Sequence, residues 1–535
     1  MASINGLVFY NMVLSGMNNL HNFERDVNRM NVFPVADGDT GTNMLLTMMG
    51  GYQYAQKDKH LGKYIVSFAR GSLLGARGNS GVILSQIFKG MSVELNNCGI
   101  VNPGEMANAF LNGYKMAYKA VLDPVEGTIL TVARIAIDNI INSVKGKMTM
   151  KEFFTLYYDE LLEVLKTTPE YLKVLKDANV VDSGAYGYVK IIEGMLSALD
   201  GNIIEPHDEE FIQKMNEEYL ANENISSRYC LNFLLQLMHG EKYQKSFSFA
   251  KFNEDLKGFG NISNIFKDGS TIKVRIYTDQ LDELISYVHQ YGEFASFNLE
   301  NNSVNKEQKV VNKLPYKKLY IVAVSDSSAM DEKLQSYGAD VLIRGNKSHS
   351  PSTKDFIDAL SSIEADKIVV FPNDENFVET IRQAVSLAKI KNVEIINSYD
   401  VIVSYYALMM DIPDDTTSNR IVSFKESISN VDYINIYRAT RDLNNESFSC
   451  KEGDVIATLN KELVFASSNH LDTLKNTLEH VENIEDKVGM LVVINNNDEV
   501  LFNKVESFLL ENYSDIEAEV FQGDNELIDI KVGVF

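Results

Sequence analysis

The first 200 residues carry their apolar side chains at the three- and four-residue spacing of helices, and no alternating strand pattern occurs among them. Asn102 and Pro103, for example, have the signature of an N-cap followed by the first helical residue, and Met106 and Phe110 then begin an apolar face. Such a face packs inward. The sequence therefore predicts an all-helical bundle, in which short loops bring several helix ends to one side.

Two carboxylates stand two residues apart in the stretch Asn31–Met49, NVFPVADGDTGTNMLLTMM. In an extended segment residues i and i+2 point the same way, so Asp37 and Asp39 can face one point, where carboxylate oxygens suit Mg²⁺. An apolar helix follows, and the N–H groups at its start attract phosphate. The candidate phosphate contacts there are Thr40, Gly41, Thr42 and Asn43. An Asp-Gly turn followed by an N-cap explains the same residues without a ligand.

Three further polar or glycine-rich turns lead into apolar helices. The first, Gly75–Gly81, reads GARGNSG, with Asn79 and Ser80 at the cap, and the others are DPVEGT at 123–128 and VDSGA at 181–185. Arg77 could pair with a phosphate, although a surface arginine is more often a solvated charge. No Lys-Ser or Lys-Thr follows the last glycine, so the first turn is not a Walker A loop. If the four turns meet at one end of the bundle, they line one rim.

Four segments carry a family resemblance: NVFPVADGDTGTNM, GARGNSGVILSQIF, PVEGTILTV and VDSGAYGYVKIIEGM, in that order. They closely resemble the nucleotide-binding subunit of bacterial fatty acid kinase, whose N-terminal domain is similar to the L subunit of dihydroxyacetone kinase. The resemblance covers the first 200 residues strongly and the rest more loosely. It implies an antiparallel helical barrel that holds ATP and Mg²⁺ at one end.

The resemblance also implies roles for individual residues. The expected nucleotide contacts are Thr40, Gly41, Thr42, Asn43, Asn79, Ser80, Gly127, Thr128, Asp182, Ser183 and Gly184. Asp37 and Asp39 are expected to bind the metal, with Asn31 as a weaker third ligand. Relatives of the dihydroxyacetone kinase type carry an aspartate near Asn31, and its replacement by a neutral amide weakens a second Mg²⁺ site. Arg77 joins the two aspartates as a catalytic candidate.

Composition excludes several classes of function. The formal net charge is −24, from 50 Lys and Arg against 74 Asp and Glu, so a polyanion such as nucleic acid is repelled. Cys98, Cys230 and Cys450 lie far apart without CxxC spacing, so they form no disulfide framework. No apolar run reaches the roughly 18 residues of a membrane span, and no signal peptide is evident. A cytoplasmic protein is expected.

The pattern changes after residue 200. We expect a helical domain over 1–200, a polar linker over 201–224, a middle domain over 225–300, a second linker over 301–313 and a C-terminal domain over 314–535. The middle domain has the strand, helix, strand, strand, helix, strand order of a ferredoxin-like split βαβ unit.

The C-terminal domain is expected to be a two-lobed α/β domain. Short Val- and Ile-rich runs at 319–324, 340–343, 367–371 and 392–396 alternate with helical stretches at 328–337, 353–363 and 376–389. This alternation indicates a parallel sheet covered on both faces. The resemblance extends here to fatty-acid-binding proteins of the DegV type. The loop Gly345–Thr353 could bind a ligand at the strand ends, or it could be a loop in which Ser352 or Thr353 caps the next helix.

A zinc site in the middle domain is not expected. Relatives pair a cysteine at the position of Cys230 with two histidines on a later strand, whereas this chain has Val274–Thr278, VRIYT, in that place. Arg and Tyr do not replace two imidazoles. We therefore interpret Cys230 as a buried structural thiol.

By resemblance, the expected activity is transfer of the γ-phosphate of ATP to a fatty acid carboxylate, with the acyl chain presented by a separate DegV-type lipid-binding partner and the kinase subunit present as a homodimer. Two alternatives stay open: a dihydroxyacetone-type kinase, and a non-catalytic nucleotide-binding scaffold. His21 and His60 belong to no visible nucleophile–base pair, so a hydrolase has little support.

Overall fold

The computed structural model describes residues 1–33, 38–144, 147–208, 228–238, 247–301, 313–345, 350–439, 442–444, 448–495, 498–525 and 527–535. Asp37, most of both predicted linkers and the middle of the Gly345–Thr353 loop lie outside these ranges. The chain divides into two units, one made of residues 1–207 and 314–535 and the other of residues 208–313. Each unit is described separately.

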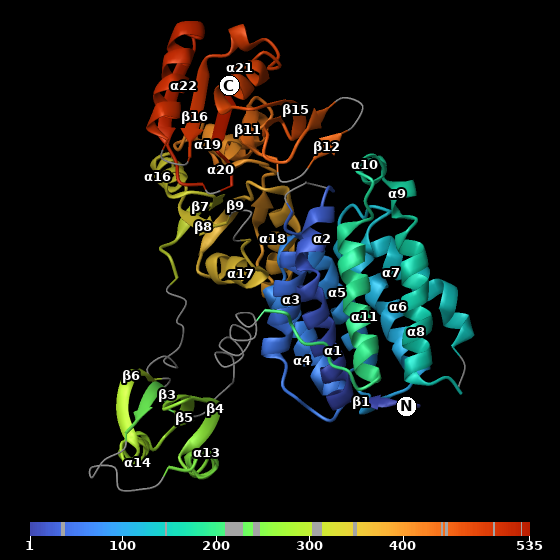
Figure 1. Ribbon diagram of the computed structural model, residues 1–535. Helices are drawn as coiled ribbons and strands as arrows, with labels where there is room; N and C mark the ends of the chain where they lie inside the picture. The colour runs from blue at the N-terminus through green and yellow to red at the C-terminus, as the bar shows by residue number, and fades with distance from the viewer. Residues whose placement is uncertain are drawn as a thin grey trace. The chain divides into compact units, whose positions relative to one another are not determined.

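The first part of the larger unit is helical, as predicted (Figure 1). Its helices are α1 (Gly6–Asn22), α2 (Glu24–Met30), α3 (Thr40–Tyr54), α4 (Leu61–Gly75), α5 (Gly78–Leu95), α6 (Pro103–Ala120), α7 (Ile129–Ile140), α8 (Met150–Leu165), α9 (Thr168–Tyr171), α10 (Lys173–Asp177) and α11 (Ser183–Leu199). The expectation of no strand here was wrong at one place. β1 (Ile4–Asn5) and β2 (Ile100–Val101) form a short antiparallel pair between distant segments, which local periodicity does not reveal.

Caps and glycines explain how these helices begin and how closely they pack. The predicted cap of α6 is confirmed as a capping box, in which Asn102 Oδ1 accepts from the Glu105 N–H at 3.1 Å and Glu105 Oε2 accepts from the Asn102 N–H at 2.8 Å. Gly194 lets α11 lie against α1, because a Cβ there would stand 2.4 Å from the Ser15 carbonyl oxygen. Gly90 allows the same close approach between α5 and α6.

The second part of the larger unit begins with a parallel sheet. Its elements are β7 (Lys317–Ser325), α16 (Ser328–Ser336), β8 (Val341–Arg344), α17 (Thr353–Ser361), β9 (Ala365–Phe371), α18 (Glu375–Ala388) and β10 (Val393–Ile395), with the strand order β10-β9-β7-β8. Every strand and helix predicted over this range is present, with ends within two residues of the prediction. Seven consecutive residues of β7 are buried, as expected for a sheet covered on both faces.

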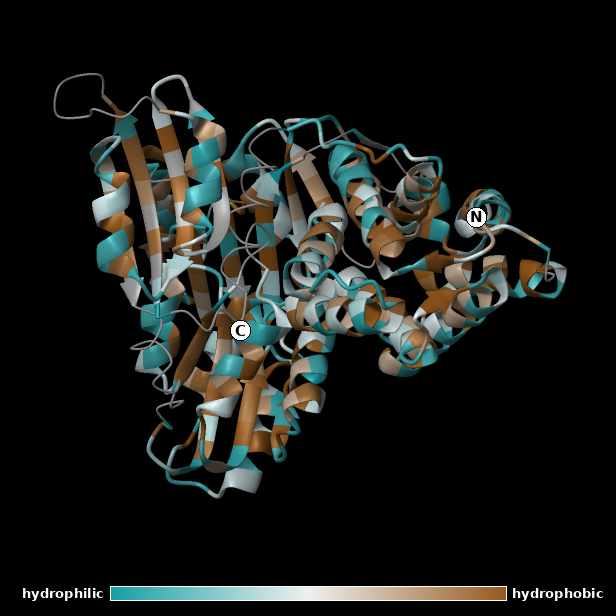
Figure 2. Cartoon of the chain, turned by 90° about the horizontal axis from the view of Figure 1, so that it is seen from below, coloured by the Kyte–Doolittle hydropathy of each residue, from teal (hydrophilic) through white to brown (hydrophobic). Residues whose placement is uncertain are grey.

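Two helices, α19 (Val401–Met409) and α20 (Thr417–Ser427), lead into a mixed six-stranded sheet of order β15-β14-β11-β18-β16-β17. Its strands are β11 (Asp432–Arg438), β14 (Val455–Leu459), β15 (Glu462–Ser467), β16 (Gly489–Ile494), β17 (Glu517–Gln522) and β18 (Ile530–Val534), and its helices are α21 (His470–Leu478) and α22 (Glu499–Asn512). A small pair, β12 (Leu443–Asn444) and β13 (Ser449–Cys450), stands beside it. In Figure 2 several strands of the chain are brown over much of their length, while the helices alternate between hydrophobic and hydrophilic residues.

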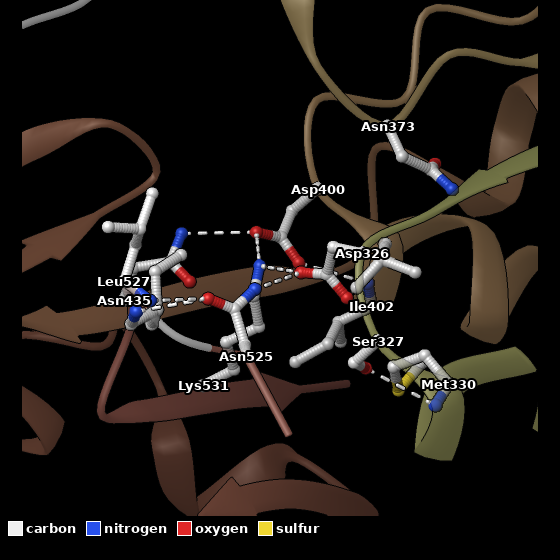
Figure 3. A network of polar contacts seen from close by, with 12 residues as sticks. Asp326, Ser327, Met330, Asn373, Asp400, Ile402, Asn435, Asn525, Leu527 and Lys531 are labelled. Carbon is white, nitrogen blue, oxygen red and sulfur yellow. Dashed lines mark hydrogen bonds and ion pairs between the residues drawn. The ribbon is translucent and has the colours of Figure 1, made fainter. Parts of the chain in front are cut away.

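A buried lysine joins the two sheets of this part. Lys531 on β18 is 4% exposed, and its Nζ lies 2.7 Å from Asp400 Oδ2 and 3.1 Å from Asp326 Oδ2 (Figure 3). Asp326 follows β7, and Asp400 is the N-cap of α19. Asn525 and Asn435 donate to the same two carboxylates.

The smaller unit is an antiparallel sheet with two helices. It runs β3 (Tyr229–Leu237), α13 (Phe249–Leu256), β4 (Gly260–Asp268), β5 (Thr271–Thr278), α14 (Leu281–Val288) and β6 (Gly292–Asn301), with the strand order β4-β5-β3-β6. This is the predicted order of elements along the chain. The backbone of Cys230 pairs with that of Tyr277, and the Cys230 side chain lies outside the described structure.

Within the described ranges, none of the helices combines the length and apolarity needed to cross a bilayer.

Candidate functional site

The N-termini of α3, α5, α7 and α11 lie together at one end of the helical region, and we call these four helix starts the rim. Ser183 Oγ, on α11, lies 3.3 Å from Thr40 Oγ1, on α3. A Cβ on Gly78 of α5 would lie 2.6 Å from Asn43 Nδ2 of α3, and one on Gly184 would lie 3.6 Å from Cβ of Ile129 at the start of α7. The four predicted turns therefore meet. Because each helix start carries a partial positive charge, the rim favours an anion.

The start of α3 places the acidic candidates. Asp39 is the N-cap of α3, is partly exposed, and accepts a hydrogen bond from Asn43 Nδ2 at 2.7 Å. Asn31 is 4% exposed. Asp37 lies outside the described residues. Among the residues that are described, no group of three or more His, Cys, Asp or Glu side chains is arranged to hold a metal ion.

Asn28 of α2 belongs to this site, although no sequence motif marks it. Its Oδ1 accepts from the Gly41 N–H at 2.7 Å and from the Thr42 N–H at 3.3 Å. Its Nδ2 donates to Thr42 Oγ1, which in turn donates to Glu24 Oε1 at 2.6 Å. Two N–H groups expected to meet phosphate are therefore engaged by a neighbouring helix. Asn28 lies outside the motif, so only the fold reveals the contact.

The start of α5 contacts both the rim and the second part of the unit. Gly78 has φ +57°, a left-handed conformation that suits glycine. Arg77 donates from Nη1 to the backbone oxygen of Ser350, and Asn79 Nδ2 donates to Asn376 Oδ1 at 3.3 Å. The phosphate role of Arg77 stays a prediction, and in this structure its guanidinium is engaged by the loop before α17. Ser80 is partly buried in the first turn of α5.

The turn before α7 is held by a polar cluster around Glu126. Glu126 Oε2 accepts from Arg134 Nη2 and from Thr131 Oγ1, both at 2.7 Å. Burial alone would raise the pKa of Glu126, but the hydrogen bonds from Thr131 and Arg134 hold the pKa below its usual value. Gly127, at φ +88°, donates its N–H to Thr131 Oγ1, and Thr128 is the N-cap of α7.

Asp182 joins two helix starts. It is 5% exposed, and its Oδ2 accepts from the Ala185 N–H at 2.8 Å, while the Ile129 N–H also donates to its carboxyl group. Burial raises the pKa of Asp182 to about 6, against the opposing effect of those two N–H groups. Asp182 therefore caps α11 and binds the start of α7. Its expected contact with nucleotide stays a prediction, as do those of Ser183 and Gly184 beside it.

The two histidines of the helical region lie outside the rim. His60 is the N-cap of α4, and its Nδ1 accepts from the Lys63 N–H. His21 Nδ1 lies 3.6 Å from Glu24 Oε2. The loop Gly345–Thr353 ends as a capped loop: Ser352 is the N-cap of α17 in a capping box with Asp355, as one of the two interpretations predicted.

Three family models match the sequence in chain order. A DAK2 domain matches residues 34–197, the middle domain of the FakA-like type of fatty acid kinase protein matches residues 226–309, and the C-terminal domain of the same FakA-like type matches residues 320–534.

Two relatives match along nearly their whole length. Protein YloV of Bacillus subtilis (strain 168) is 31% identical over 545 residues, which cover 98% of each chain. A protein of Staphylococcus aureus (strain USA300), named only as uncharacterized, is 30% identical over 538 residues, which cover 98% of this chain and 97% of its own.

Solved structures give weaker likenesses. The dihydroxyacetone kinase from C. freundii in complex with AMP-PNP and Mg²⁺ is 17% identical with a TM-score of 0.30, over 37% of this chain and 35% of its own. A DegV family protein from Thermus thermophilus, described as binding fatty acid, is 12% identical with a TM-score of 0.31, over 41% of this chain and 99% of its own.

Proposed function

Because the chain belongs to the FakA-like family of fatty acid kinase proteins, we propose that it is the ATP- and Mg²⁺-dependent component of a kinase that phosphorylates the carboxylate of a fatty acid. The observation that carries the proposal is the meeting of four helix starts beside Asp39. Phosphoryl transfer requires mainly positioning and neutralisation of phosphate charge, which helix starts and a metal ion supply.

The residues at the rim fit a magnesium nucleotide. Asp39 offers a partly exposed carboxylate, Asn31 an amide oxygen and Thr40 a hydroxyl, and Mg²⁺ prefers such hard oxygen ligands. Asp37 and Asp39 would hold the ion, which would neutralise charge on the phosphates. The starts of α5, α7 and α11 would direct Asn79, Ser80, Thr128 and Ser183 to the nucleotide.

A carboxylate acceptor needs no catalytic base. One carboxylate oxygen of the fatty acid bonds to the γ-phosphorus, the bond to the β,γ-bridging oxygen breaks, and ADP leaves with that electron pair. The carboxylate is already ionised at neutral pH, so no proton has to be removed. A hydroxyl acceptor such as dihydroxyacetone loses a proton and calls for a base. The two histidines of the described helical region have other contacts: His60 caps α4 and His21 adjoins Glu24. The site therefore suits a carboxylate acceptor better than a hydroxyl acceptor.

We further propose that the fatty acid arrives on a separate DegV-type lipid-binding protein and that two copies of the kinase chain form a homodimer. Both parts rest on membership of the FakA-like family, whose C-terminal domain matches residues 320–534.

The test is release of ADP by the purified chain with Mg²⁺ and ATP, with a lipid-loaded DegV-type protein as acceptor. Asp39→Asn keeps an oxygen for Asn43 but removes the charge, and we expect turnover to fall by about 100-fold or more. The matched control is Asp177→Asn, an exposed carboxylate on α10, which should behave as the wild type.

The same assay separates the alternatives. Turnover with dihydroxyacetone and none with loaded fatty acid would favour a dihydroxyacetone-type kinase. Binding of ATP without turnover on any acceptor would identify a non-catalytic scaffold.

A further inference from the structure

The C-terminal half of the chain forms hydrogen bonds with the backbone of the Gly75–Gly81 loop. The N–H of Thr353, at the start of α17, donates to the carbonyl oxygen of Ala76 at 3.0 Å, and the Thr353 hydroxyl donates to the same oxygen at 3.3 Å. The neighbouring Arg77 donates to the carbonyl of Ser350. Thr353 is completely buried, so these contacts are shielded from water.

A second line of contacts comes from α18. Asn376 Oδ1 accepts from Asn79 Nδ2 at 3.3 Å. One α-helical heptad later, Gln383 donates from Nε2 to the carbonyl oxygen of Leu73 at 2.9 Å and accepts from Gln86 Nε2 at 2.7 Å. Asn376 and Gln383 are 7% and 6% exposed. Residues seven apart share one helix face, so α18 presents a buried polar face to α4 and α5.

A residue of the same helix is affected by the charge of a second turn of the rim. Glu379 stands between Asn376 and Gln383 on α18. Burial raises the pKa of its carboxyl, Arg382 opposes this shift, and the charge of Asp123, in the turn before α7, adds to it. Glu379 thus lies close enough to the turn before α7 for the charge of Asp123 to act on its carboxyl group. Figure 1 shows α17 and α18 on the side of the helical region where α4 and α5 lie, and both pairs of helices are in contact.

The Gly75–Gly81 loop is therefore fixed from two sides. On one side Gly78 lies against Asn43 of α3, with no room for a Cβ. On the other side three backbone or side-chain groups of the loop bond to α17, α18 and the segment before α17. Loss of a buried hydrogen bond leaves its partner unsatisfied. A shift of α18 would therefore move the loop and the start of α5.

We propose that Asn376 and Gln383 of α18 are positioning residues of the nucleotide site, which hold the Gly75–Gly81 loop in the form that binds the magnesium nucleotide. This proposal rests on the proposed function. Its consequence is that nucleotide binding in the helical region and the seating of α18 are thermodynamically coupled. Such coupling is reciprocal: α18 strengthens nucleotide binding, and nucleotide tightens the contact with α18.

A double-mutant cycle in the full chain tests whether α18 strengthens nucleotide binding. We expect Asn376→Ala to weaken binding of ADP with Mg²⁺, measured by calorimetry, by about threefold to tenfold. Because Asn376 acts through Asn79, the effect should largely disappear in an Asn79→Ala background. The control is Ser386→Ala, an exposed position on the same helix. A purely structural role would instead lower thermal stability and leave the dissociation constant of the folded protein unchanged, which would overturn the proposal.

Hydrogen exchange on the wild type tests whether nucleotide tightens the contact with α18. Addition of ADP and Mg²⁺ should slow exchange in residues 353–388, although they belong to the C-terminal half. Protection confined to residues 1–200, with ADP bound, would overturn the inference and leave the kinase proposal standing. Failure of the wild-type chain to bind ADP at all would overturn both.

Discussion

Asp182 shows how one buried carboxyl group can serve two helices at once. It accepts hydrogen bonds from the N–H groups of Ala185 and Ile129, which lie in the first turns of α11 and α7. Both helix starts favour a negative charge. Burial has the larger effect and raises its pKa to about 6. Part of the stability gained by capping is therefore lost whenever the group is ionised.

This conflict predicts a pH dependence. In the unfolded chain the pKa of an aspartate is about 3.9, so between roughly pH 4 and pH 6 the folded state holds more protons than the unfolded state. The stabilisation is present at low pH and falls as the pH rises through 6. Asp182→Asn keeps an accepting oxygen without the charge. From pH 5 to pH 7.5, the variant should gain about 1–2 kcal/mol relative to the wild type.

Urea denaturation of the full chain at the two pH values, followed by circular dichroism, measures that difference. The control is Asp177→Asn, whose carboxyl group is exposed. An unchanged difference between wild type and Asp182→Asn at pH 5 and pH 7.5 would show that Asp182 is ionised at both values.

The sequence motifs identify some residues of the site but miss others that the structure brings into it. The motifs identify Asp39, Asn79, Ser183 and Gly184, and these residues stand at the helix starts where the motifs place them. No motif identifies Asn28, because its contact with Gly41 and Thr42 joins residues of two helices whose spacing follows no pattern. Arg77 is a candidate through its charge, yet the partner it contacts lies 273 residues away.

At the scale of elements, the start of α5 depends on a glycine that is constrained twice. Gly78 has φ +57°, and a Cβ would lie 2.6 Å from Asn43 Nδ2. A left-handed conformation costs a non-glycine residue about 1–2 kcal/mol, and the displaced Asn43 would disturb its hydrogen bond with Asp39.

We therefore expect Gly78→Ala to lower the free energy of unfolding by about 1–3 kcal/mol and to weaken ADP binding. Thermal denaturation and calorimetry measure the two effects. Gly99→Ala is the control, because its nearest neighbour would be His60 Cδ2 at an ordinary 3.4 Å. A Gly78→Ala protein with unchanged stability and affinity would show that the loop accommodates a side chain and is not fixed by α3.

Elements with strong local patterns were predictable, and contacts between distant elements were not. Strands β7 to β10 follow from apolar runs four to six residues long, whose ends the turn residues mark. The hydrogen bonds of α17 and α18 with the Gly75–Gly81 loop and its flanking helices depend on polar residues such as Gln383. Their spacing in the sequence is the same as that of polar residues on an exposed helix face, so the sequence does not reveal these contacts. Closure of the helices into a barrel and the ferredoxin-like assignment of the middle domain stay predictions.

At the scale of the whole molecule, the two C-terminal sheets are joined through charge as well as through apolar packing. Burial alone would lower the pKa of Lys531, but Asp326 and Asp400 hold the pKa above its usual value. The lysine therefore keeps its charge in the folded state. Its contribution to stability is present below the unfolded pKa of about 10.4 and is lost only as the pH rises through the folded value.

Lys531→Met tests this junction, because it removes the cation and leaves two carboxylates facing each other in a buried place. We expect the free energy of unfolding of the C-terminal part to fall by about 3–5 kcal/mol. The triple variant with Asp326→Asn and Asp400→Asn as well removes all three charges and should regain a large share of that loss, since Asn at 400 can still cap α19. Urea denaturation of the three proteins measures both effects. If the triple variant were less stable than Lys531→Met, the carboxylates would have to stabilise the junction through contacts other than those with Lys531, and the two sheets would be joined by hydrogen bonds to Asn435 and Asn525 instead of by charge.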